Sequence, residues 1–237
     1  MRPVFTRYAA FTRYAVAWCY LAAFCVAELV YAVLPDRDQA SVLAWASTNV
    51  HNLAHDPLGC MIASAFFPAG ALLAWPVLIA LAMFGANAVL GNWRTAVTCA
   101  AGHVIGTLVS EGILACQIAH GTRPAADRFI TDVGPSYVVV TALAVGLLWG
   151  RWPVRGAAAL DLAGLVFVGG IFSGLGQLAV AAVGHATALV TGCALGSLLV
   201  WQRRRQLAAV RLAADREERP PQPEPGRDDR DLENQEK

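Results

Sequence analysis

The sequence has little charge, a single lysine and no CxxC pair. Only 15% of its 237 residues are charged and 57% are hydrophobic, whereas soluble domains are about 45–50% apolar. This shortage of charge excludes a soluble domain, and a net charge of +1 gives no reason to expect a nucleic-acid partner. All six cysteines lie in apolar stretches, which argues against a disulfide framework or a cysteine metal site. We expect no metal and no cofactor.

Charge is concentrated at the end of the chain. Residues 203–237 hold nine acidic and nine basic side chains, and the rest of the chain holds eight acids and nine bases. From about residue 213 prolines occur among dense mixed charge, and such a segment cannot bury enough apolar surface to fold. The sequence predicts an all-α membrane domain over residues 1–205 and a disordered cytoplasmic tail over residues 206–237.

Long apolar segments predict a polytopic membrane protein. A helix needs about 20 apolar residues to cross a hydrocarbon core of about 30 Å. The first segment is too long for the core of a cleaved signal peptide, so we interpret it as a retained helix. Pro68 and Pro76 will bend the second or separate its first turns from the rest. Six segments fit, at about 14–34, 60–84, 94–118, 135–150, 157–175 and 178–201.

The arginines predict the orientation, because positive residues near span ends stay on the cytoplasmic side. With both termini inside, nine arginines near the spans lie inside and three lie outside, namely Arg37, Arg123 and Arg128. The outer loop over residues 35–59 has the apolar spacing of an interfacial helix. Arginine outnumbers lysine 17 to 1 and alanine is abundant. This bias is typical of GC-rich bacteria, so we expect a bacterial cell membrane.

Ionisable residues inside the predicted spans are functional candidates, because each costs several kcal/mol unless it is paired or hydrated. Counted at about 1.5 Å per residue, four polar residues share a layer about 22 to 27 Å above the inner arginines. They are Glu28, Glu111, Ser136 and His185. His103 and Asp161 lie nearer the cytoplasmic side than this layer.

Ser136 lies near the start of the predicted helix over residues 135–150, whose 16 residues, about 24 Å, are too short to cross the membrane core. The loop before it must therefore dip to an aqueous pocket. An imidazole can remove a hydroxyl proton, and helix N-terminal amides can stabilise an oxyanion, so Ser136 and His185 are a candidate nucleophile and base. The alternatives are that Gly-Pro-Ser is ordinary helix-start chemistry and that His185 is a hydrogen-bonded core residue.

Three motifs occur in order along the chain. They are an expected turn from Phe84 to Gly91 after the second span, Gly134-Pro135-Ser136 at the fourth, and Gly184-His185 with Gly192 and Gly196 in the sixth. Over about residues 14–201 this order resembles the rhomboid family of intramembrane serine proteases, in a divergent branch. The resemblance implies six core helices and a Ser136–His185 dyad that cleaves the transmembrane segment of a client protein. It also implies that the fourth and sixth helices approach closely at their glycines.

The sequence departs from the rhomboid pattern. Tyr137 follows the serine where rhomboids have glycine, and Asn87 and Val89 replace the usual acidic and basic residues. A gapless alignment places Ala71 and Trp75 at the positions of the family's oxyanion histidine and asparagine, and neither can donate as they do. The outer loop offers replacement donors, whose alternative role is to cap helix ends. They are Asn49, His51, Asn52 and His55.

One face of the third span is polar, with His103, Thr107, Ser110 and Glu111 at helical spacing. It is either a hydrogen-bonded bundle interface or, with Glu28, part of the serine's surroundings. Three functions stay open: an intramembrane serine protease, a non-catalytic rhomboid-like protein that binds client membrane helices, and a small proton- or ion-coupled transporter. The expected partners are the lipid bilayer and a client transmembrane segment, and no nucleic acid.

Overall fold

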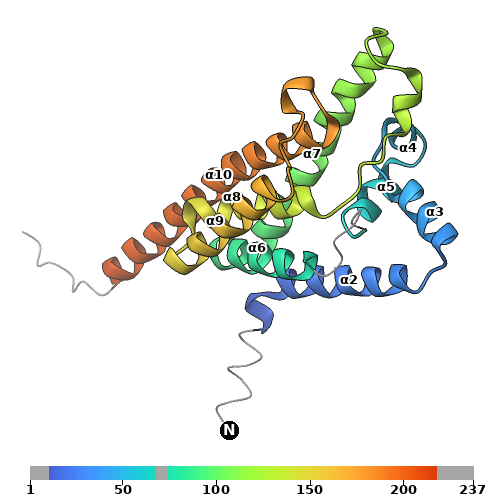
Figure 1. Ribbon diagram of the computed structural model, residues 1–237. Coiled ribbons are helices and arrows are strands. Elements are labelled where there is room, and N and C mark those ends of the chain that lie inside the picture. Colours follow the sequence, from blue (N-terminus) through green and yellow to red (C-terminus); the bar gives the residue numbers. More distant parts are fainter. Residues whose placement is uncertain (1–10, 68–73, 218–237) are drawn as a thin grey trace, which may run out of the picture. The chain divides into compact units, whose positions relative to one another are not determined.

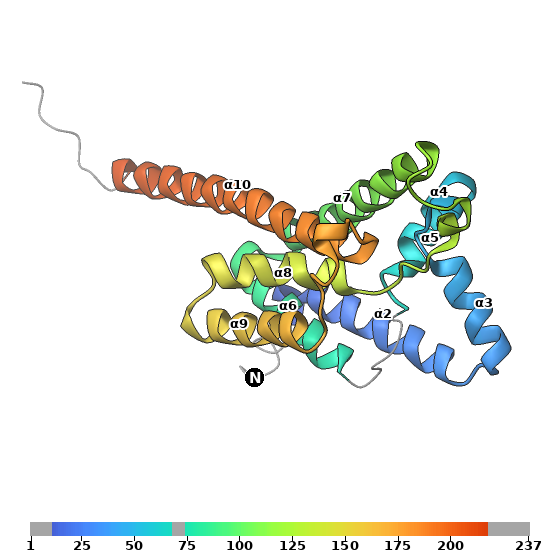
Figure 2. The same ribbon diagram turned by 45° about the horizontal axis from the view of Figure 1, so that its top comes forward.

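A computed structural model describes residues 11–67 and 74–217, and every regular element in these ranges is a helix (Figures 1 and 2). The chain divides into two compact units, residues 1–200 and residues 201–237. The helices are α2 (Ala15–Ala32), α3 (Asp36–Ala46), α4 (Val50–His55), α5 (Pro57–Ser64), α6 (Trp75–Leu90), α7 (Asn92–Ala119), η1 (Ala125–Phe129), α8 (Ser136–Trp149), α9 (Trp152–Phe167), η2 (Leu175–Gln177) and α10 (Val180–Glu217).

Three of the described helices are long and apolar enough to cross a membrane. They are α2, α7 and the part of α10 from Val180 to Leu212. Helices α6 and α8 are apolar but shorter, with 16 and 14 residues. The all-α class predicted from the sequence is confirmed, and helix length with composition identifies three of the six predicted spans.

The second predicted span consists of two helices. Helix α5 ends at Ser64, and α6 begins at Trp75 with Pro76 in its first turn, where proline is well tolerated. The segment Phe84 to Gly91, expected to be a turn, is instead helical as far as Leu90. Only Gly91, with φ of +79°, separates α6 from α7, because glycine adopts this conformation without a Cβ penalty.

The fifth span and the tail also differ from the sequence prediction. Helix α9 covers residues 152–167 instead of 157–175, and Gly169 and Gly170, which follow its C-cap residue Val168, are typical of a helix end. Helix α10 continues to residue 217, past residue 206 where we expected disorder to begin. Its last turns are rich in alanine, leucine and arginine, which favour helix. Residues 218–237 lie outside the described residues.

Helix α8 lies at the centre of the first unit. It packs against α6, α7 and α9, and every residue from Tyr137 to Gly146 is buried. Because neighbours surround α8, its rotation about its own axis is restricted by packing. The first turn of this helix, which carries Ser136, is therefore held in one orientation.

Glycines let α8 and α10 come into close contact. A Cβ atom on Gly192 would lie 2.6 Å from the Thr141 carbonyl oxygen, and one on Gly196 would lie 2.6 Å from the Trp149 ring. The Thr141 hydroxyl donates a hydrogen bond of 3.2 Å to the carbonyl of Ala188. The close approach expected at these glycines is present in the structure.

We predict opposite effects for two glycine-to-alanine substitutions. Gly164→Ala should leave the melting temperature unchanged or raise it, because nothing lies within 4 Å of the added Cβ and alanine is the better helix former by about 1 kcal/mol. Gly192→Ala should lower it, because the added methyl meets the α8 backbone and overpacking costs about 1–3 kcal/mol. Thermal unfolding in detergent, followed by tryptophan fluorescence, measures both. Equal melting temperatures would contradict the close contact.

Candidate functional site

Ser136 is the first residue of α8 and is half-buried. Within the described part of the chain its Oγ atom has no hydrogen-bond partner. The turn before it is fixed by Gly134, which has φ of +138° and donates its N–H to the Ser64 carbonyl at 2.8 Å. The start of α8 is therefore tied to the end of α5.

His185 is buried on α10 and has one free ring nitrogen. Its Nδ1 lies 2.9 Å from the carbonyl oxygen of Ile171, and its Nε2 has no partner among the described residues. Because a carbonyl only accepts hydrogen bonds, Nδ1 carries the proton in this contact and Nε2 of the neutral ring is an acceptor. This is the tautomer that a general base uses.

Tyr137 is the α8 side chain that faces His185. The two rings are 5.0 Å apart between centroids and nearly perpendicular, at 82°. The tyrosine ring also lies against Gly184, where any Cβ atom would collide with it. No hydrogen bond joins Ser136 to His185 within the described residues. The structure thus brings Tyr137 to the position next to His185.

Helical register explains this arrangement. The α8 residues that contact the α10 glycines recur every three to four positions, as Tyr137, Thr141, Ala144, Val145 and Trp149. Successive residues of an α-helix are turned by about 100°. The residue before Tyr137 therefore lies to one side of this contact stripe.

Asp132 holds the hydroxyl of Tyr137. The Tyr137 hydroxyl donates a hydrogen bond of 3.0 Å to Asp132 Oδ2. The Asp132 backbone is bound in turn by the chain between α3 and α4: its N–H donates to Ser47 Oγ at 2.9 Å, and its carbonyl accepts from the Thr48 N–H at 2.9 Å and from its hydroxyl at 3.1 Å. Burial raises the pKa of Asp132 to about 6, against the opposing effect of its two side-chain hydrogen bonds.

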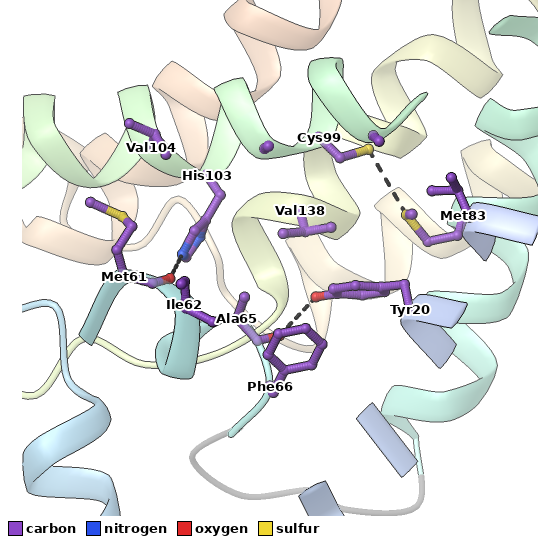
Figure 3. A pocket seen from close by; sticks show the side chains of 13 residues that line it. Tyr20, Met61, Ile62, Ala65, Phe66, Met83, Cys99, His103, Val104 and Val138 are labelled. Atoms are coloured by element: carbon purple, nitrogen blue, oxygen red, sulfur yellow. Dashed lines mark hydrogen bonds between the residues drawn. The ribbon is translucent and has the colours of Figure 1, made fainter. Parts of the chain in front are cut away.

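The polar face of α7 is divided between two environments. His103 Nε2 lies 3.1 Å from Ser64 Oγ and 2.9 Å from the Met61 carbonyl oxygen, so it joins α7 to α5 (Figure 3). Glu111 is 2% exposed, its carboxylate has no hydrogen-bond partner within the described residues, and it interacts electrostatically with Asp132. Glu28 is buried on α2, where it interacts electrostatically with Tyr31.

The four candidate oxyanion donors form local bonds around α4. Asn49 caps the helix by accepting the Asn52 N–H at 2.9 Å, and its amide donates to Ser47 Oγ at 3.2 Å. The Asn52 amide donates to the carbonyls of Ala44 and Ser47, at 2.7 and 2.8 Å. His55 Nδ1 lies 2.7 Å from the His51 carbonyl oxygen, and the two histidine rings are 4.3 Å apart.

Sequence reasoning missed the role of Tyr137 and Asp132. In the sequence, Tyr137 stands out only as a departure from a motif. Its spacing of four residues from Thr141, together with the small residues of α10, is nevertheless typical of a contact between two helices. Nothing in the sequence marks Asp132 as buried, because its partners Ser47 and Thr48 are 85 and 84 residues away. Of the two aligned oxyanion positions, Ala71 lies outside the described residues and Trp75 begins α6.

An apolar cavity of about 310 Å³ lies among α2, α5 and α7, and neither Ser136 nor His185 lines it (Figure 3). Its polar groups are largely occupied, since the Tyr20 hydroxyl donates to the Ala65 carbonyl at 2.7 Å and His103 contacts Met61. The cavity is therefore separate from the candidate dyad.

No group of three or more potential metal ligands gathers anywhere in the described ranges.

The described residues form an apolar helical bundle, with a serine at the start of α8 and a buried histidine on α10, as expected of a helical membrane protein. A family model described as "Rhomboid-like protein" matches residues 10–205. The chain belongs to this rhomboid-like family and is a rhomboid-like membrane protein. No curated protein and no solved structure matches it.

The contact between Tyr137 and Asp132 predicts a difference between two neighbouring substitutions. Tyr137→Phe should destabilise the protein by about 1–3 kcal/mol, because it leaves the buried Asp132 carboxylate without its closest donor. Ser136→Ala should be nearly neutral, because it removes no hydrogen bond. Melting temperatures of the two variants in one detergent test this, and a larger loss in Ser136→Ala would contradict the assignment.

The raised pKa of Asp132 predicts the sign of a pH effect. A carboxyl group with a pKa of about 6 when folded and about 3.9 when unfolded binds its proton more tightly in the folded chain. Its contribution to stability is present at about pH 4 and is lost as the pH rises through about 6, with a slope of up to about 1.4 kcal/mol per pH unit. Asp132→Asn should flatten the melting temperature between pH 4.5 and 7.5. A profile identical to wild type would rule out this source.

Proposed function

We propose that the chain is a non-catalytic rhomboid-like protein with six membrane-spanning helices, both termini cytoplasmic, that holds a transmembrane segment of a client protein in a bacterial cell membrane. The observation that carries the proposal is the position of Tyr137. Its ring packs in the α8–α10 contact against Gly184 and His185, so the α8 side chain that faces the histidine is an aromatic ring and not the serine hydroxyl.

Geometry argues against proton transfer between Ser136 and His185. A general base must come within about 2.6–3.2 Å of the atom whose proton it takes, directly or through one water. Tyr137 is the α8 side chain that faces His185, so placing Ser136 in that position would need a turn of α8 by the roughly 100° between neighbouring residues. The close contact of Gly192 with Thr141 and the burial of α8 on all sides oppose such a turn.

The two asparagines of the outer loop support the same proposal. An oxyanion hole needs hydrogen-bond donors that are free to point at the developing charge. The side-chain amides of Asn49 and Asn52 are already bound to neighbouring groups around α3 and α4.

The exposed face of α9 supports helix binding. Leu160, Phe167 and Val168 are 77%, 85% and 91% exposed, and open space surrounds Gly156 and Gly164. Helices associate in lipid mainly by packing at small residues, since apolar burial gives little advantage there. This face is where we expect a client helix to pack.

A fluorophosphonate probe tests whether Ser136 is a nucleophile. We expect purified protein in detergent to show no labelling that depends on this residue, under conditions in which an active rhomboid is labelled. Ser136→Ala and His185→Ala are the comparison variants. Labelling of the wild type that disappears in both variants would establish an active dyad and overturn the proposal.

Site-specific photo-crosslinking tests client binding. A photoreactive residue at Leu160 on α9 should give adducts with transmembrane peptides of other membrane proteins, whereas one at Leu29 on α2, which is 68% exposed, should give only lipid adducts. Gly164→Leu should abolish the Leu160 adducts by blocking close approach. Equal adduct formation at both positions, or no effect of Gly164→Leu, would contradict binding at α9.

A further inference from the structure

A second cavity of about 220 Å³ lies where α4, the end of α7 and η1 meet. These three elements pack against one another, and both views show α4 beside the end of α7 (Figures 1 and 2). The floor is apolar and includes Val50, Ala115 and Ile118. The polar lining consists of His51, His55 and Arg128, so every charged or titratable side chain in the lining is a hydrogen-bond donor or can become one.

Arg128 supplies an available positive charge. Its Nε donates to the Ala125 carbonyl at 2.9 Å, and no carboxylate pairs with its guanidinium within the described residues. The neighbouring acid, Asp127, is paired with Arg123 at 3.4 Å. The acid that follows His55, Asp56, accepts the Gly59 N–H at the start of α5. The side chains that line the cavity therefore include a positive charge and no acid, which suits an anion.

We infer from two observations that the cavity lies at the level of a membrane surface. It is built at the end of α7, one of the three helices long and apolar enough to span. Trp45, whose carbonyl accepts a hydrogen bond from the Asn52 amide of α4, is 52% exposed, and tryptophan concentrates where membrane meets water. The Phe129 ring is 4.8 Å from that of His51.

We propose that this cavity, which we name the headgroup pocket, binds the phosphate of an anionic membrane phospholipid. Arg128 provides the charge, His51 provides a further donor, and Val50 and Ile118 contact the glycerol and the beginning of the acyl chains. An apolar floor would add nothing to the binding of a free inorganic anion. The volume is below the roughly 300–1,000 Å³ of pockets for whole organic ligands, which suits a headgroup. The proposal is independent of proteolytic activity.

Binding of phosphatidylglycerol to the full-length protein in neutral detergent tests this proposal. Thermal stabilisation is measured as lipid is added, with phosphatidylcholine as the zwitterionic reference and glycerol 3-phosphate as the soluble source of the same phosphate. We expect phosphatidylglycerol to raise the melting temperature saturably, and the other two to have little effect. Equal stabilisation by glycerol 3-phosphate would overturn the assignment to lipid.

Four variants separate the pocket from general surface charge. Arg128→Gln should weaken the apparent affinity for phosphatidylglycerol about fivefold, which is the effect of one cation near an anionic surface, and His51→Gln should weaken it less. Arg37→Gln removes an exposed arginine from the same predicted face but outside the pocket, and should have no effect. Arg128→Lys loses the bond to Ala125 but keeps the charge, and should bind nearly as wild type. An equal loss in Arg37→Gln, or no loss in Arg128→Gln, would overturn the proposal.

Discussion

The close packing of α8 against its neighbours is the constraint on which the rest of the first unit depends. In lipid, apolar burial alone does little to hold helices together, so small residues and interhelical hydrogen bonds must do so. Here the glycines of α10 admit the α8 backbone, and Thr141 donates to Ala188 across the contact. Once this contact is made, the direction of every side chain in the first turn of α8 follows from helical geometry.

The helical class and most apolar segments could be predicted from the sequence, because hydrophobic length and helix punctuation are local properties. The end of α9 was misplaced because apolar residues continue past Phe167, although two glycines there end the helix. The tail was misjudged near its start because residues 206–217 are charged but are also strong helix formers. In both places composition and backbone preference disagreed, and backbone preference decided the structure.

The candidate site was predicted less well, because its geometry depends on register and on contacts distant in the chain. Ser136 and His185 were singled out from their chemistry and their common depth; Ser136 begins α8 and His185 lies in the second turn of α10. Neighbouring α8 residues point in directions about 100° apart, so the rotation of α8 decides which of them faces His185. The Gly-Pro-Ser motif alone does not predict this rotation. The roles of Ser47 and Thr48 depend on the folded outer segment meeting the loop before α8.

The bonds around Asp132 make the loop before α8 a shared support. One side of this loop is held by the chain between α3 and α4, another by the end of α5 through Gly134, and the Asp132 side chain holds the Tyr137 hydroxyl. A displacement of the surface helices would therefore shift the Tyr137 ring, which packs against His185. Asp132 thus connects the outer segment, through Tyr137, to the surroundings of the buried histidine.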